Sequence, residues 1–593
     1  MSRPGNVSAA RLLATLARRT LAPALALLSA GCAVLGVPAV DPAPDSPPAQ
    51  RSVTVQEESV PAPTELDPEL VFDYLLADIA ERRGDPKTSL EAATRVAERT
   101  GDPALILRAF RAALRGGDAA VALDMAALLD RAGFDAIRVG FARVQAFLVD
   151  DRVDDAQREI FNLLSDPPEG DRKTVFNHAG EVFAQQREPA PYVAIMRELA
   201  DAYPGDPHGY FAVAYVASRA QELDALGAAI SRALELDPDW EQAAVVKFAY
   251  LVQVRDRRAA SDFAEDFVAR NPKALDLAQR LAQLLAAQGD FEAAHRYFER
   301  ILRHQPENSE ILMTTALVRM QMEKWASARR LLLRHLRLNP DSDETRMRLA
   351  RVASERHRFD EAANWYGSVT DENLVFEAQL QVAEVLNDSS GGEAALDHLA
   401  GLTPASREEE VEIVLARERV LRSMSRIEDA FQLLDAAVQE IPDDGDLLYS
   451  RALLAAELGE LERHEQDIRQ VIAIDPDNAH AYNALGYTLA DQTKRYDEAL
   501  ELISRALELA PEDPFILDSM GWVQYRLGRY DDAEEYLRRA LAIRDDAEIA
   551  AHLGEVLWVK GGRAEAEKLW QRALTADPEN RTLLDTLKRL QPR

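Results

Sequence analysis

The chain has 593 residues, several times the usual length of a domain, so one compact core is not expected. Its formal net charge of −32 argues against nucleic acid, whose phosphates require a basic surface, and against electrostatic docking on anionic lipid. The single cysteine excludes an internal disulfide framework and a Cys-rich zinc site.

Residues 1–31 have the pattern of an export signal. Arginines without any acid precede the short apolar run TLAPALALLSAG, which is shorter than the roughly 20 residues that cross a bilayer. The run ends at Cys32, and the small residues Ala30 and Gly31 before it resemble a bacterial lipobox, although Ser29 stands where that motif prefers leucine. The resemblance implies that Cys32 becomes the acylated N-terminus of an exported lipoprotein. The alternative is a plain secretory signal with an incidental cysteine.

Residues 32–65 follow as a segment rich in proline, alanine and small polar residues. Such a composition buries little apolar surface, so we expect an extended tether between the lipid and a folded body. A leader without function would have the same composition. By resemblance to sorted lipoproteins, Ala33 after the cysteine permits transfer to the outer membrane, whereas an aspartate there would retain the protein at the inner membrane.

The body of the chain repeats with a period of about 34 residues. Prolines mark this period at Pro238, Pro272, Pro306 and Pro340, at Pro442 and Pro476, then at Pro511 and, two repeats later, at Pro578. A fixed period of this length suggests tetratricopeptide repeats, which are pairs of antiparallel helices stacked side by side.

A packing pattern recurs within each period when its proline is numbered position 32. Residues 514–546 carry Met520, Gly521, Gly528, Tyr530, Ala533 and Leu537 at positions 7, 8, 15, 17, 20 and 24. Small residues at positions 8 and 20 let the two helices of a pair approach closely, and the larger residues at 7, 17 and 24 fill the space between them. Glycine at position 15 supplies the positive φ that ends the first helix.

The sequence therefore predicts an all-α fold, a superhelical solenoid of about fifteen tetratricopeptide-type helix pairs with a capping helix over 581–593. Clear repeats are expected over 206–342 and 411–580, and degenerate ones over 66–205 and 343–410. Within the last range the stretch NDSSGGEAA interrupts the register and is the best candidate for a bend.

Catalytic patterns do not emerge from the sequence. His178 and His464 each have a nearby glutamate but no second histidine at metal-ligand spacing. No glycine-rich phosphate loop, nucleophile elbow or calcium loop is present in the sequence, and no segment outside the repeats is long enough for a catalytic domain. We expect no enzyme activity, no cofactor and no metal; the alternative is an enzyme fused to repeats.

Partner binding is expected on the concave inner face of the solenoid, which first-helix positions line in this repeat family. An aromatic strip falls on these positions in the C-terminal repeats, formed by Tyr487, Trp522, Tyr525 and Trp558. A second, apolar stretch is formed by Met313, Leu317, Met320 and Met347. Exposed aromatic and methionine side chains are typical binding anchors. Packing on a neighbouring helix, or ordinary core filling, is the alternative for both sets.

The passage over 479–580, which includes NALGYTLADQTKRYDEALELISRALELAPEDPFILDSMGWVQYRLGRYDDAEEYLRRAL, carries a more specific resemblance. Together with the lipobox and the stretch LDPELVFDYLLADIAERRGD, with which the predicted repeats begin, this passage resembles the LbcA-like outer-membrane lipoproteins of proteobacteria. The resemblance implies a scaffold facing the periplasm that binds a periplasmic carboxyl-terminal processing protease and its substrates, the peptidoglycan cross-link hydrolases. The alternative is a scaffold for an envelope assembly machine that exports polysaccharide, builds a pilus or inserts outer-membrane proteins.

Overall fold

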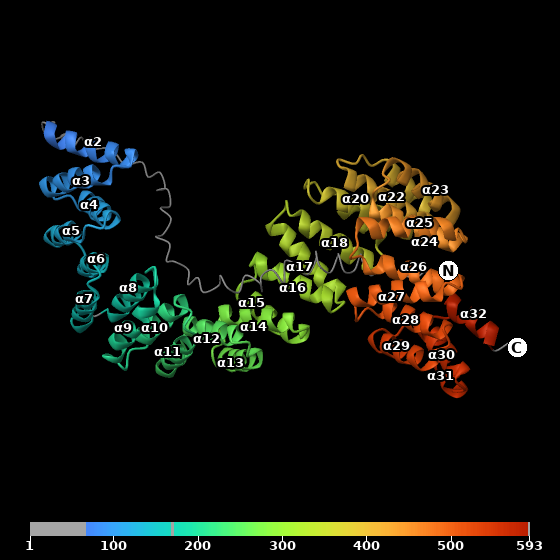
Figure 1. The fold of residues 1–593 in the computed structure, drawn as a ribbon. Helices are drawn as coiled ribbons and strands as arrows, with labels where there is room; N and C mark the ends of the chain where they lie inside the picture. Colours follow the sequence, from blue (N-terminus) through green and yellow to red (C-terminus); the bar gives the residue numbers. More distant parts are fainter. Residues whose placement is uncertain (1–66, 168–170, 591–593) are drawn as a thin grey trace. The chain divides into compact units, whose positions relative to one another are not determined.

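The computed structural model of the protein describes residues 67–167 and 171–590. These residues form 31 helices and no strand, which confirms the all-α class. Successive helices are antiparallel neighbours, so they make fifteen pairs and one final helix (Figure 1). Cys32 and the predicted tether lie outside the described residues. Two compact units divide between Ile311 and Leu312.

The unit that ends at Ile311 holds seven complete pairs. Its first helices are α2 (Pro68–Arg83), α4 (Pro103–Gly116), α6 (Ala136–Val149), α8 (Arg172–Ala184), α10 (Pro207–Arg219), α12 (Glu241–Gln253) and α14 (Leu275–Ala287). Its second helices are α3 (Pro86–Thr100), α5 (Ala119–Arg131), α7 (Val153–Ser165), α9 (Ala190–Asp201), α11 (Leu223–Leu236), α13 (Arg257–Arg270) and α15 (Phe291–His304). The next helix, α16 (Ser309–Gln321), spans the division between the units.

The unit that begins at Leu312 continues the alternation. Its further first helices are α18 (Asp343–Glu355), α20 (Val375–Ser389), α22 (Arg407–Ser423), α24 (Gly445–Leu458), α26 (Ala479–Gln492), α28 (Pro514–Arg526) and α30 (Ala547–Val559). Its second helices are α17 (Trp325–Leu338), α19 (Phe359–Gly367), α21 (Gly392–Ala400), α23 (Ile427–Glu440), α25 (Leu461–Ile474), α27 (Tyr496–Leu509), α29 (Tyr530–Ile543) and α31 (Arg563–Ala576). The final helix, α32 (Arg581–Leu590), packs on α30.

The periodic prolines end the second helices, as their spacing predicts. Helix α25 ends at Ile474, two residues before Pro476, and α27 ends at Leu509, two residues before Pro511. A residue that precedes proline is driven out of the helical region by the pyrrolidine ring, so the helix stops there. The turn that follows then leads into the next first helix.

The turn after most first helices contains one residue with positive φ, and the turns after α8 and α26 are the exceptions. Through the middle of the chain these residues recur every 34 positions, at Gln221, Arg255, Gly289, Glu323, His357, Gly391, Ser425 and Gly459. The expectation that NDSSGGEAA interrupts the register is therefore wrong, because Gly391 within it keeps the period. The irregularity falls instead on the second helices α19 and α21, which have only nine residues each. The bend at this place stays a prediction.

The predicted packing pattern explains how the two helices of a pair meet. Gly554 on α30 faces Trp570 on α31, whose ring is buried and donates a hydrogen bond from Nε1 to the carbonyl oxygen of Ala551 at 3.3 Å. A Cβ on Gly554 would lie 2.0 Å from that nitrogen, so only glycine fits. Position 17 departs from the prediction: Tyr530 is 39% exposed, because it begins α29 at the outer end of the pair.

Successive first helices form the inner layer of the C-terminal repeats. Helix α28 packs on both α26 and α30, and α30 packs on α32. Second helices of neighbouring repeats make few or no such contacts over the described residues 479–590. Residues on the free side of α26, α28 and α30 are therefore brought close to one another.

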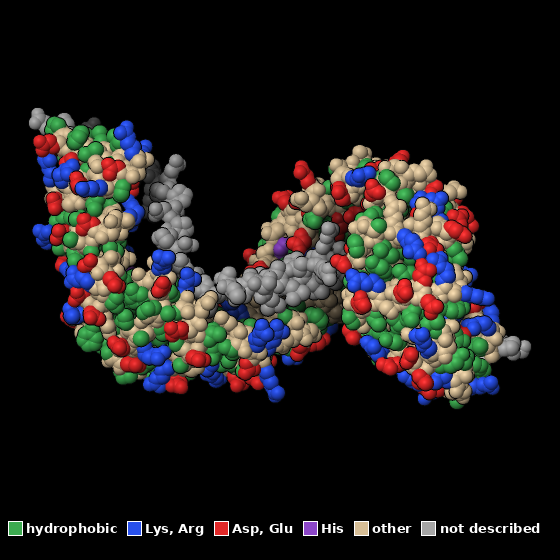
Figure 2. Space-filling view, in the orientation of Figure 1, with side chains coloured by type: hydrophobic (Ala, Val, Ile, Leu, Met, Phe, Trp, Pro, Cys, Tyr) green, Lys and Arg blue, Asp and Glu red, His purple; other side chains and the backbone are tan. Residues whose placement is uncertain are grey.

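The outer surface is charged, as the composition predicts. Basic and acidic side chains are mixed over the face seen in Figure 2. Within the part of the chain that the structure describes, no helix has both the length and the apolar character needed to cross a membrane.

We predict that Gly521→Ala weakens the fold, because a Cβ there would lie 2.5 Å from Cγ of Leu537 and 3.1 Å from the carbonyl oxygen of Ala533. Overpacking of this kind lowers the free energy of unfolding by about 1–3 kcal/mol. The matched control is Gly445→Ala, at the start of α24, where no atom lies within 4 Å of the new Cβ. Thermal unfolding followed by circular dichroism should show a lower midpoint for Gly521→Ala alone. Equal midpoints for the two variants would contradict the packing account.

Candidate partner-binding site

An aromatic and charged cluster lies where α26, α28 and α30 meet. At its centre is His552 on α30, which is 2% exposed and whose Nδ1 lies 3.0 Å from both carboxylate oxygens of Asp518 on α28. The indole of Trp522 stacks on the imidazole, with ring centroids 4.3 Å apart at 25°. The ring of Tyr487, from α26, lies 6.2 Å from the imidazole. We call this set, together with Tyr525 and Glu555, the inner-face cluster.

Glu555 ties the cluster to the final helix. Its carboxylate is almost fully buried and accepts a hydrogen bond from the hydroxyl of Tyr525 at 2.9 Å. It also accepts two hydrogen bonds from the guanidinium of Arg589 on α32, each 2.5 Å long. A buried carboxylate held by a bidentate arginine is fixed in position, so α32 is tied to the same face.

A second set of polar contacts holds Trp522 from the other side. Its indole Nε1 donates a hydrogen bond to the Asp491 carboxylate at 3.2 Å. Arg526 donates from Nη1 to the Asp491 carbonyl oxygen at 3.0 Å, and its guanidinium lies 5.9 Å from the Trp522 ring centroid. The aromatic ring is therefore oriented by groups on the preceding repeat and on its own helix.

The charges in the cluster shift the pKa of the groups it buries. Burial lowers the pKa of His552, but the nearby carboxylates of Asp518, Glu548 and Glu555 outweigh it and raise that pKa to about 9. Burial raises the pKa of Glu548, and it raises the pKa of Tyr525 above its ordinary value. At neutral pH the imidazole is thus a buried cation that partly neutralises an acidic site.

The structure brings three of the four predicted aromatic residues together. Trp522 stacks on Tyr525 with ring centroids 5.1 Å apart, and both Trp522 and Tyr487 lie against His552. Trp522 is buried at 6% exposure, whereas Tyr487 and Tyr525 are half-buried. Trp558 is not part of the cluster's ring contacts, since it lies 5.6 Å from the ring of Trp570 within its own pair.

The predicted apolar stretch belongs to the core of its repeats. Met320 is buried, and Met313 and Leu317 pack on the same cluster of buried side chains. Met347 packs on the next cluster, around Tyr366. These contacts match the packing alternative for the methionines more closely than a free binding surface.

The sequence analysis missed His552 in the cluster and Arg589 beside it. Each stands one period, 34 residues, after the acid it contacts, Asp518 and Glu555 respectively. A search for opposite charges at the same first-helix position of consecutive repeats would have found both pairs. Residues at this spacing meet because neighbouring first helices lie side by side.

The cluster has polar groups beside it that remain open to a partner. The side chains of Asp491 and Arg589 remain 38% and 55% exposed. The phenol of Tyr525, the guanidinium of Arg589 and the carboxylate of Asp491 together suit the mixed polar and apolar surface of a polypeptide. Among the described residues, no group of three or more His, Cys, Asp and Glu side chains is placed to hold a metal ion.

Stacked helix pairs with an inner layer of first helices define the fold as a helical-repeat solenoid. Residues 275–320, 313–372, 416–479, 477–546 and 519–581 match the tetratricopeptide-repeat family. Residues 275–372 and 416–581 of the chain therefore carry tetratricopeptide repeats, and such repeats suggest a scaffold for protein–protein interaction.

Several known proteins share parts of the sequence. The TPR repeat-containing protein PA4667 of Pseudomonas aeruginosa is 42% identical over 207 residues, which cover 35% of each chain. The human protein O-mannosyl-transferase TMTC1 is 25% identical over 28% of this chain and 19% of its own length. The chain thus spans about a third and a fifth of these relatives. The TPR repeat-containing protein YpiA of Bacillus subtilis is 20% identical over 70% of this chain and 90% of its own.

Solved structures of repeat proteins also align with parts of the chain. A TPR protein from Thermus thermophilus is 27% identical and covers 30% of this chain and 96% of its own, with a TM-score of 0.27. A tetratricopeptide repeat protein from Parabacteroides merdae is 15% identical over 42% of this chain and 98% of its own, with a TM-score of 0.35.

We predict that the Asp518–His552 pair makes stability depend on pH. The folded pKa of His552, about 9, lies above its ordinary value of 6.5. The contribution of the protonated imidazole and its three acidic neighbours to the free energy of unfolding is therefore fully present below about pH 6.5 and is lost as pH rises through about 9. It amounts to about 3 kcal/mol.

Thermal unfolding between pH 6 and 10 tests this with Asp518→Asn, which should be less stable at low pH and should show a smaller decline toward pH 9, because Glu548 and Glu555 remain near the imidazole. Asp477→Asn is the matched control, because it removes one acid whose side chain is 84% exposed. If the wild type and Asp518→Asn declined in parallel across this range, the buried cation would be excluded.

Proposed function

We propose that this protein is a non-enzymatic adaptor of the outer membrane, anchored by lipid at Cys32 and facing the periplasm. It binds a periplasmic carboxyl-terminal processing protease and presents peptidoglycan cross-link hydrolases to it as substrates. Holding both on one scaffold makes their encounter intramolecular and so raises their effective concentration. Proteolysis of the hydrolases is then faster near the membrane than in free solution.

This proposal rests on one observation: the sequence resemblance and the inner-face cluster fall on the same residues, 479–580. The resemblance to LbcA-like adaptor lipoproteins is densest there, and the same residues supply almost all of the inner-face cluster. An inner face that orders aromatic and charged side chains through buried hydrogen bonds is preorganised for a partner, so fewer side chains lose freedom when the partner binds.

The signal pattern at the N-terminus supports the proposed location, in which the protein is anchored by lipid and faces the periplasm. The basic, acid-free start, the short apolar run and the small residues before Cys32 are those of a lipoprotein signal. Two or three acyl chains give lasting attachment, since each buried CH₂ contributes about 0.8 kcal/mol. The tether then separates the lipid from the first helix pair.

Affinity capture from a detergent-solubilised envelope tests the partner. We predict that the tagged full chain recovers a carboxyl-terminal processing protease together with cell-wall hydrolases, identified by mass spectrometry. Tyr525→Ala combined with Arg526→Ala should lower recovery of at least one of them by about tenfold, because both side chains form the edge of the inner-face cluster. Ile543→Ala, at an exposed apolar side chain of α29, is the matched control.

Recovery of polysaccharide-export, pilus or outer-membrane insertion components, with no protease, would support the assembly scaffold and reject the adaptor. Unfolding midpoints of the variants separate lost binding from lost folding.

We also predict that Cys32→Ala releases the protein from membranes. Without the thiol no acyl chain can be attached, so the variant should fail to incorporate a fatty-acid label and should move to the soluble fraction. A wild-type chain that takes up no label, or that fractionates like the variant, would exclude the anchor.

A further inference from the structure

Helix α2 has two faces of different character. Asp73, Ala77 and Ala80 are buried against the helices that follow, and Asp73 pairs with Arg95 on α3 at 2.8 Å. On the opposite side Phe72, Leu75 and Ile79 are 63%, 51% and 46% exposed. Together with Tyr74 these are four of the twelve large exposed apolar side chains among the described residues.

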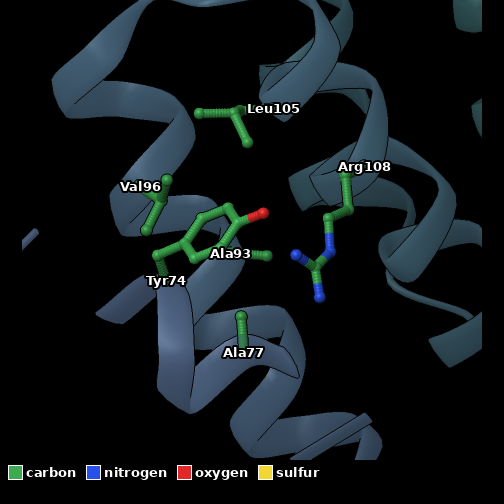
Figure 3. Close-up of a pocket in the computed structure, with 6 residues that line it drawn as sticks. All are labelled: Tyr74, Ala77, Ala93, Val96, Leu105 and Arg108. Carbon is green, nitrogen blue, oxygen red and sulfur yellow. The ribbon is translucent and has the colours of Figure 1, made fainter. Parts of the chain in front are cut away.

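Tyr74 differs from the other three. Its ring points into a small pocket between α2, α3 and α4 that Ala77, Ala93, Val96, Leu105 and Arg108 line (Figure 3). The Arg108 guanidinium lies 5.5 Å from the ring centroid. Part of Tyr74 is thus already engaged within its own unit, and the unpartnered apolar seam consists of Phe72, Leu75 and Ile79.

The spacing of the seam is that of a helix–helix contact. Residues 72, 75 and 79 are separated by three and then four positions, which places them in one line on the helix. In the rest of the solenoid, a neighbouring pair covers such a line. The three side chains of the seam are 46% to 63% exposed, and a cluster of large exposed apolar side chains marks an interaction site.

The charges at the two ends of α2 are complementary to those of a second copy that runs antiparallel to it. The first turn carries Glu69, whose side chain is 83% exposed and pairs with Arg99 on α3 at 3.3 Å. The last turn carries Arg83 and Arg82, and the Arg82 side chain is 80% exposed and pairs with Asp78 on the same helix at 3.0 Å. Ion pairs as exposed as these are weak, so their charges can exchange partners.

The seam lies at the middle of the helix. If a second α2 runs antiparallel, Phe72 faces Ile79, Leu75 lies near the two-fold axis, and Glu69 of each copy lies beside the arginines of the other. A parallel pairing would bring the arginines of both copies together.

We propose that two copies of this chain associate through α2, packed antiparallel along the seam of Phe72, Leu75 and Ile79, with Glu69 of one copy near Arg82 and Arg83 of the other. One pair of helices about 24 Å long forms a smaller contact than the interfaces of stable dimers. The dimer is therefore weak, and its fraction rises with protein concentration. The exposed ion pairs set the orientation more than the affinity. The proposal does not depend on the function proposed above.

Thiol cross-linking of the full chain in extracts of the expressing cells tests the contact and its direction. Leu75→Cys puts the two thiols near the two-fold axis, so a short bis-maleimide should produce a cross-linked dimer. Glu69→Cys puts them at opposite ends of the paired helices, about 20 Å apart along the axis, and should stay at the background of the unsubstituted chain. The unsubstituted chain measures any reaction of Cys32, and Leu75→Cys in a Cys32→Ser background assigns the product to position 75.

The seam is tested by adding Phe72→Glu to Leu75→Cys, which should abolish the cross-link because it places a charge in the contact. Ile543→Glu added to Leu75→Cys is the control at another exposed apolar site, 48% exposed, and it should leave the yield unchanged. Phe72 is exposed, so the unfolding midpoint should not move. Absence of a dimer from position 75, equal yields from positions 69 and 75, or a product of different mass that contains another protein would each overturn the proposal.

Discussion

The close approach of two helices within each pair is the constraint on which the rest of the structure depends. Small residues on the first helix make room for a large side chain of the second, as Gly521 does for Leu537 and Gly554 for Trp570. A positive-φ turn such as Gly528 then reverses the chain within a few residues. Pairs that close in this way present the same face to their neighbours, so stacking follows without any long-range sequence signal.

Stacking in turn decides which side chains can act together. First helices pack side by side in the C-terminal repeats, so residues one period apart meet, as Asp518 and His552 do at 3.0 Å. These contacts bury charges that solvent would otherwise weaken, and they hold the aromatic rings of Trp522 and Tyr525 in place. A surface whose side chains are already ordered loses little freedom when a partner binds, which is the property a scaffold requires.

The sequence was sufficient for the fold because its signals are local. The periodic prolines such as Pro476 follow the ends of helices, and positive-φ glycines such as Gly528 reverse the chain. It was less informative where the pattern is degenerate: Gly391 keeps the register even though its neighbours look irregular. The site was found in part. Tyr525 was visible as an inner-face aromatic residue, but the role of His552 depends on a neighbour in the next repeat that amphipathic spacing alone does not reveal.

Hydrogen–deuterium exchange on the full chain, alone and with the captured partner, tests the central claim that the inner layer of first helices is the docking surface. The account predicts that bound partner slows amide exchange in α26, α28 and α30 and leaves the second helices α27, α29 and α31 unchanged. Protection confined to the second helices, with the first helices unaffected, would contradict it.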